Sequence, residues 1–92
     1  MILNMKEAEL ERQIKVVANR RRLAILNTLH KREEANVTEI AVAIKLSFTS
    51  TSKHLTMLER AGFIEKEQRS LNVYYSLAPD APKLLSFLFG QL

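Results

Sequence analysis

The spacing of the apolar residues changes at Gly62. Before it, apolar residues recur three, four and seven positions apart, which is the spacing of one face of an α-helix. After it, residues 63–68 and 72–77 are short β-prone runs joined by 69–71, a pattern typical of a β-hairpin. Residues 83–92 are again rich in Leu and Phe and predict a terminal helix. The order α-α-α-α-β-β-α predicts a mainly α fold of the α+β class.

Capping residues indicate where the predicted helices begin and end. Asn19, Thr38 and Ser47 each precede an apolar periodic segment and can accept hydrogen bonds from the first free N–H groups of a helix. Leu46, just before Ser47, is placed to act as a hydrophobic staple. Gly62 stands where a helix often ends in the left-handed conformation.

The length and composition fit one small domain over residues 1–92 that binds a partner. With 92 residues and no cysteine, the chain has a small core and no disulfide, so oligomerisation is the expected remedy. The net charge is +4 at pH 7, and most of the excess lies in residues 1–34. A mild basic excess is compatible with nucleic-acid binding, and it is equally compatible with ordinary solvated charge.

Several classes of protein are not expected. No apolar run is long enough to span a membrane and the first residues do not read as a signal peptide, so we expect a cytoplasmic protein without a membrane partner. The two glycines, Gly62 and Gly90, do not make a phosphate loop, and no G-x-S-x-G motif is present. We therefore expect no enzymatic activity.

The segment LSFTSTSKHLTMLERAGF, residues 46–63, opens a predicted helix with an unusual density of hydroxyl residues. On a helical projection Thr51, Leu55 and Leu58 form the buried stripe. The opposite face carries short hydroxyls and two cations and no carboxylate: Thr49, Lys53, Thr56 and Arg60, flanked by Ser50 and Ser52. Helices 38–45 and 48–61 then read as a helix-turn-helix whose second helix enters the major groove. An ordinary polar helix face is the alternative interpretation.

Residues 18–77 resemble the ArsR-type winged helix-turn-helix transcriptional regulators. The resemblance depends on short motifs in order: Arg22-Leu23 with Ile25-Leu26, Glu39-Ile40-Ala41, Leu46-Ser47, Ser52-Lys53-His54-Leu55, Leu58, Ala61-Gly62 and Val73-Tyr74-Tyr75-Ser76-Leu77. Each motif is weak alone, but together they cover about two thirds of the chain. The resemblance implies a helix-turn-helix at 38–61 and a wing at 63–77.

The resemblance also implies a homodimer that binds double-stranded DNA at an inverted repeat. The first and last helices, within 1–18 and 80–92, would pack together through Leu3, Leu10, Ile14, Leu84, Phe87 and Leu88. A core helix of the monomer is the alternative for the last segment. The implied DNA-reading positions are Thr49, Ser50, Ser52 and Lys53, while His54 would support the helix. Arg69 and Ser70 at the wing tip and Arg22 could reach DNA, or the arginines could be solvated or paired with Glu.

This chain departs from the family pattern in two places. Metal-sensing members carry two cysteines where this chain has Asn36 and Thr38, and the terminal helix offers Asp80 without a histidine. No metal site, cofactor or small-molecule ligand is therefore expected. The wing lacks glycine and is nearly neutral, so we expect it to contribute weakly to DNA binding.

These observations favour a homodimeric, metal-independent DNA-binding regulator that acts as a repressor. Two alternatives remain open at this stage. The winged helix could be a protein-interaction module that has lost DNA binding, or an architectural module that binds DNA with little sequence preference.

Overall fold

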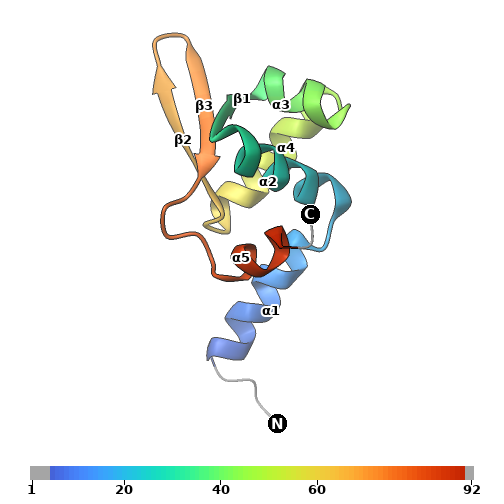
Figure 1. Ribbon diagram of the computed structural model, residues 1–92, viewed down its shortest axis with the longest axis vertical. Helices are drawn as coiled ribbons and strands as arrows, with labels where there is room; N and C mark the ends of the chain where they lie inside the picture. Colours follow the sequence, from blue (N-terminus) through green and yellow to red (C-terminus); the bar gives the residue numbers. More distant parts are fainter. Residues whose placement is uncertain (1–4, 91–92) are drawn as a thin grey trace.

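The computed structural model describes residues 5–90 of the chain, which form five helices and three strands (Figure 1). The helices are α1 (Met5–Val17), α2 (Arg20–Arg32), α3 (Val37–Ile44), α4 (Phe48–Arg60) and α5 (Leu84–Phe89), and the strands are β1 (Glu34–Asn36), β2 (Ile64–Arg69) and β3 (Asn72–Leu77). The winged helix-turn-helix order predicted from the sequence is confirmed. No helix among residues 5–90 is long and apolar enough to cross a membrane.

The core lies where α2, α3 and α4 meet the base of the hairpin. The three helices and Phe63, which directly precedes β2, supply side chains of which almost no surface remains exposed: Ile25, Leu26, Leu29, Ile40, Leu55, Leu58 and Phe63. Burial of each such side chain contributes roughly 1.5–3 kcal/mol relative to its exposure. The helical spacing in the sequence therefore identified the main packing faces correctly.

The sheet has three strands in the order β1-β3-β2, all antiparallel, so the predicted two-stranded hairpin was incomplete. The hairpin register pairs Ile64 with Leu77 and Arg69 with Asn72. Strand β1 adds to the other edge of β3, where Ala35 pairs with Tyr75. A three-residue strand has no periodicity of its own, so only the pairing with β3 defines it.

Two predicted helix starts and one predicted helix end are confirmed. The Asn19 side chain accepts a hydrogen bond from the backbone N–H of Arg22 (3.0 Å), and Ser47 Oγ accepts one from the N–H of Ser50 (3.1 Å). Gly62 follows α4 with φ of +83°, in the left-handed region that favours glycine. Ser47 and Gly62 thus mark the two ends of α4, the second helix of the helix-turn-helix.

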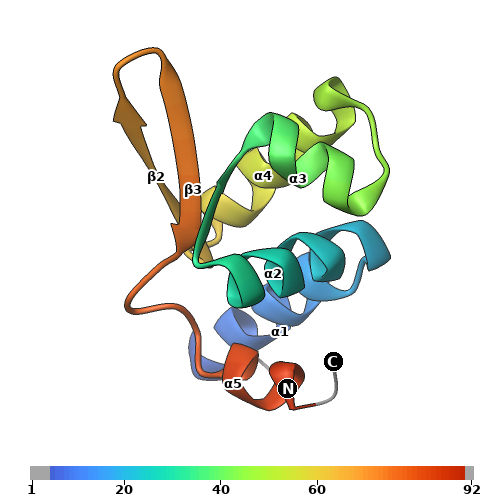
Figure 2. The same ribbon diagram turned by 45° about the horizontal axis from the view of Figure 1, so that its top comes forward.

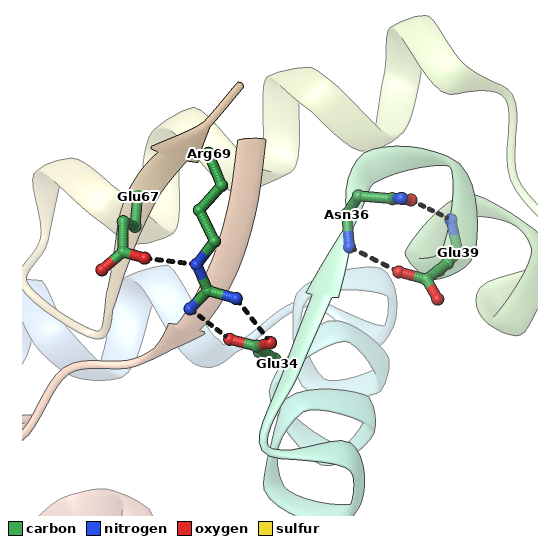
Figure 3. A network of polar contacts seen from close by, with 5 residues as sticks. All are labelled: Glu34, Asn36, Glu39, Glu67 and Arg69. Carbon is green, nitrogen blue, oxygen red and sulfur yellow. Dashed lines mark hydrogen bonds and ion pairs between the residues drawn. The ribbon is translucent and has the colours of Figure 1, made fainter. Parts of the chain in front are cut away.

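The predicted cap of the third helix was wrong. Asn36, not Thr38, is the residue that caps the start of α3. The Asn36 side chain accepts a hydrogen bond from the N–H of Glu39, and the Glu39 carboxylate accepts one from the N–H of Asn36, each at 2.9 Å. This reciprocal capping box satisfies two N–H groups at once, whereas a Thr38 cap would satisfy one. Figure 3 shows the pair at the end of β1.

Helix α5 is shorter than the predicted segment 83–92 and lies beside α1 in both views (Figures 1 and 2). Leu85 is buried, and Leu84 and Leu88 are half-buried against the core of the same monomer. Phe87 points outward, with 68% of its surface exposed. The terminal helix therefore combines a core face with an exposed apolar residue.

Candidate nucleic-acid interface

A helix-turn-helix positions the hydroxyl-rich helix α4 against α3. The chain turns sharply at Lys45, which adopts the left-handed conformation with φ of +57°, and the N–H of Leu46 donates to the carbonyl of Ala41 (3.0 Å). Arg21 Nη1 donates to the carbonyl of Ile44 (3.2 Å), one of the last carbonyls of α3 that has no partner within the helix. The turn is thus stabilised from α2.

The exposed face of α4 has the composition that the helical projection predicted. Thr49, Lys53, Thr56 and Arg60 are exposed, while the opposite stripe is buried in the core. Within residues 5–90, neither Lys53 nor Arg60 has an ion-pair partner. Both cations are therefore available to an anionic partner, and their contact with DNA stays a prediction.

The nearest carboxylate on α4 is turned away from this face. Glu59 is half-buried and its Oε1 lies 3.6 Å from Lys66 Nζ on β2. That ion pair holds a negative charge beside the strand rather than beside Lys53 or Arg60. An anionic polymer can approach the exposed face of α4 without meeting a carboxylate of the same helix.

The hydroxyls of α4 differ in how much they are engaged. Thr56 Oγ1 donates to the carbonyl of Ser52 (3.0 Å), which leaves its lone pairs free to accept. Ser50 and Ser52 are half-buried, and Thr49 is exposed at the start of the helix. Thr51 is fully buried, and its hydroxyl has no hydrogen-bond partner in the part of the chain described by the structure.

Phe48, the first residue of α4, was not predicted from the sequence as a candidate contact residue. Its side chain is 58% exposed and lines a cleft of about 240 Å³, together with residues 36–38 at the start of α3 and residues 71–73 of the wing. A large aromatic residue directly after a capping serine was the available signal. The first residue of this helix precedes the part that packs in the core, so its side chain stays exposed. The Phe48 ring adds apolar surface to the end of the helix nearest the turn.

Arg22, which the sequence placed among the residues that could reach DNA, is buried in the monomer. Only 8% of its surface is exposed, and its guanidinium is engaged inside the monomer. Nε donates to the carbonyl of Val16, and Nη1 lies 3.2 Å from His54 Nδ1 and 3.4 Å from Met57 Sδ. Arg22 therefore links the end of α1 to the middle of α4.

His54 has the supporting role that the resemblance implied. Its ring is half-buried on α4 with Nδ1 directed at Arg22. Burial lowers the pKa of His54, and the positive charges of Arg22 and Arg21 lower it further. The neutral ring, with Nδ1 as acceptor, fits this arrangement.

Arg69 is exposed on the wing but is surrounded by carboxylates (Figure 3). Its two terminal nitrogens each lie 2.8 Å from an oxygen of Glu34 on β1, and Nε donates to Glu67. The guanidinium also lies 5.0 Å from the ring centre of Tyr74. The hydrogen bond from Arg69 lowers the pKa of the Glu34 carboxyl. Contact between Arg69 and DNA stays a prediction. It would require Arg69 to exchange its hydrogen bonds with Glu34 and Glu67 for bonds to DNA.

The predicted dimerisation residues divide into exposed and half-buried groups. Leu10 and Ile14 on α1 are 47% and 46% exposed, and Phe87 is also exposed. Leu84 and Leu88 contact the monomer core, so part of their surface is already covered, and Leu3 lies outside the described residues. A groove of about 440 Å³ runs along α1 beside Leu10.

Residues 5–90 contain no cluster of three His, Cys, Asp or Glu side chains that could hold a metal ion. His30 stacks on Phe89, with ring centres 4.0 Å apart, so this histidine contributes to the packing of α5.

Three comparisons relate the chain to known proteins. The model of the MarR family matches residues 18–72. The transcriptional repressor PagR of Bacillus anthracis is 35% identical over 64 residues, which cover 70% of this chain and 64% of PagR, just under two thirds of its length. HlyU from Vibrio cholerae superposes with a TM-score of 0.83 at 29% identity, covering 97% of this chain and 96% of HlyU.

A homodimeric winged helix-turn-helix DNA-binding domain from Mycobacterium bovis, titled a possible ArsR-family transcriptional regulator, is similarly close. Its TM-score is 0.75 at 29% identity, with coverage of 97% of this chain and 82% of that domain.

Proposed function

Because this chain belongs to the MarR family, we propose that it is a sequence-specific double-stranded DNA-binding transcriptional regulator that acts as a repressor. The proposal covers residues 1–92 as one domain, with 38–61 as the helix-turn-helix, 63–77 as the wing, and 1–18 and 80–92 as dimerisation segments. The similarity to the repressor PagR supports the direction of regulation.

The carboxylate-free face of α4 is the observation that carries the proposal. Lys53 and Arg60 have no ion-pair partner among residues 5–90, and Thr49 and Thr56 lie exposed beside them. Cations fix a helix on the phosphates, while short hydroxyls permit close approach and can bond base edges. We assign phosphate contact to Lys53 and Arg60, and base reading to Thr49, Ser50, Ser52 and Thr56.

We infer further that the dimer has the ArsR-type arrangement, formed through the first and last helices. Leu10, Ile14 and Phe87 are exposed apolar side chains on these helices, and a second copy would cover them. Leu3, Leu84 and Leu88 would complete that surface. The similarity to the homodimeric domain from Mycobacterium bovis supports dimerisation itself.

A two-fold dimer would place two recognition helices about 34 Å apart, one turn of DNA, and so require an inverted repeat. Binding would need no metal ion or cofactor, because the contacts assigned to DNA are side-chain cations and hydroxyls. Arg69 and Ser70 would add a minor contribution at the wing.

Selection from a random DNA library tests the proposal. The purified protein is incubated with the library at low and near-physiological salt, the bound fraction is sequenced, and affinity is measured by fluorescence anisotropy. A palindromic motif that survives the higher salt is the expected result. Salt-labile binding without a motif would indicate an architectural module, and no binding at either salt would favour a protein-interaction module.

Sedimentation velocity tests the dimer. Phe87→Glu with Leu10→Glu should convert the protein to monomer, because a carboxylate would be buried at the interface. Val42→Glu is the matched control, since Val42 is 73% exposed on α3 and lies outside the proposed interface. A variant that stays dimeric after both charge insertions would contradict the ArsR-type arrangement.

A further inference from the structure

The tip of the wing breaks two rules of local stability. The turn between β2 and β3 is made by Ser70 and Leu71, and Ser70 has φ of +59°, a conformation that glycine or asparagine adopts more readily. Leu71 is 95% exposed, so nearly all of its apolar surface is hydrated. Neither the positive φ of Ser70 nor the exposed side chain of Leu71 contributes to the packing of the monomer. Local rules broken together are a signature of a functional position.

The cations of the wing do not occupy this tip. Arg69 is drawn toward β1 by the two 2.8 Å bonds to Glu34 and by Glu67, as Figure 3 shows. Lys66, near the base of β2, faces Glu59 on α4. The apolar side chain of Leu71 is therefore left exposed at the tip of the wing.

Leu71 is continuous with the surface proposed to bind DNA. With Asn72 and Val73 it lines one side of a cleft of about 240 Å³. The other side is lined by residues 36–38 at the start of α3 and by Phe48, the first residue of α4. When α4 occupies the major groove, the hairpin beside it extends over the flanking DNA. In Figure 1 the hairpin projects well beyond the helices on that side.

We propose that Leu71 enters the minor groove flanking each half-site and selects base pairs that lack the guanine 2-amino group. The inference rests on the proposed function. The floor of the minor groove at an A·T pair carries only the A N3 and T O2 acceptors, whereas a G·C pair adds a protruding N–H₂ donor. Leucine cannot accept a hydrogen bond from that donor and would remove it from water. Proteins that bind the minor groove frequently insert apolar side chains, leucine among them, as wedges between base steps.

The test uses the selected operator with single base-pair changes in the flank. Each A·T pair is replaced by G·C and, separately, by inosine·C, which has the major-groove pattern of G·C without the 2-amino group. At one flanking position per half-site, we expect G·C to weaken binding at least about fivefold and inosine·C to restore it. In Leu71→Ala and Leu71→Ser the three operators should bind equally.

Val42→Ala, which shortens an exposed apolar side chain on α3 outside the proposed dimer interface, is the matched control and should keep the G·C penalty. An equal penalty in wild type and Leu71→Ala would overturn the assignment, as would inosine·C being as poor as G·C. A selected motif with an insensitive flank would refute the role of Leu71 and leave the proposed function standing. Failure to select any motif would refute both.

Discussion

Arg22 on α2 and His54 on α4 face each other across the interior of the helix-turn-helix, with Nη1 3.2 Å from Nδ1. The same guanidinium reaches the carbonyl of Val16 at the end of α1. One buried side chain thus links the helix proposed for dimerisation to the helix proposed for DNA reading. Replacing this side chain should therefore lower the free energy of unfolding rather than remove a phosphate contact.

Arg22→Lys is expected to lower the free energy of unfolding by about 1–3 kcal/mol, because the carbonyl of Val16 and His54 lose a buried donor that lysine cannot replace at both positions. Urea unfolding followed by circular dichroism measures the change. Arg20→Lys, at an exposed neighbouring position, should leave stability within about 0.5 kcal/mol. Equal stability of both variants would mean that the buried contacts of Arg22 do not stabilise the fold.

The lowered pKa of His54 predicts that stability decreases in mild acid. An unfolded histidine titrates near 6.5, while burial and the charges of Arg22 and Arg21 keep the folded ring neutral to lower pH. Between the folded pKa and about 6.5 the unfolded chain binds more protons, so the free energy of unfolding falls as pH drops through that window. Below the folded pKa this contribution is lost. Urea titrations at several pH values should show a weaker slope for His54→Gln, and an unchanged slope would exclude His54 as the source.

Thr51, the first buried residue of α4, carries a buried hydroxyl without a partner among the residues described. Thr51→Val keeps the branched shape and removes the desolvated polar group, so we expect the free energy of unfolding to rise by about 1 kcal/mol. Thr49→Val, on the exposed side of the same helix, is the control and should change it little. Destabilisation by Thr51→Val would mean that the hydroxyl has a partner in solution.

Local sequence patterns were sufficient to predict most of the fold and the composition of the exposed face of α4. Helical spacing placed Thr51 and Leu55 inward and Lys53 outward, because the angular positions on one helix follow directly from sequence separation. The caps at Asn19 and Ser47 were predictable for the same local reason. The contact of these exposed residues with DNA remains a prediction.

Features set by distant contacts could not be predicted. Arg20, Arg21 and Arg22 are equivalent in sequence, and only the packing of α1 and α4 around α2 buries the third. Strand β1 is defined by its pairing with β3. The hydrogen bonds between Arg69 and Glu34 join residues that are 35 positions apart in the sequence. No local pattern encodes such separations.

Lys53→Ala should weaken binding to every DNA sequence and reduce the magnitude of the salt slope, because each phosphate contact releases condensed counterion. For a dimer the slope in log affinity against log salt should fall by about two, one unit for each half-site. Anisotropy titrations at several salt concentrations measure this. Ser52→Ala is the contrasting variant: it should alter the preferred bases and keep the salt slope. Identical losses for both variants on all sequences would remove the distinction between phosphate contact and base reading.

Phe48 extends an exposed ring from the first residue of α4, where recognition helices approach base edges. The thymine 5-methyl is the apolar group that base pairs present in the major groove, so we expect Phe48 to contact one thymine in each half-site. Replacing that thymine by deoxyuridine removes one methyl and should weaken binding about fourfold per half-site. In Phe48→Ala the two operators should bind equally, while Val42→Ala, which changes an exposed apolar residue outside the assigned contacts, should preserve the difference. If deoxyuridine costs Phe48→Ala as much as it costs the wild type, the ring packs on the DNA backbone or on the wing and reads no base.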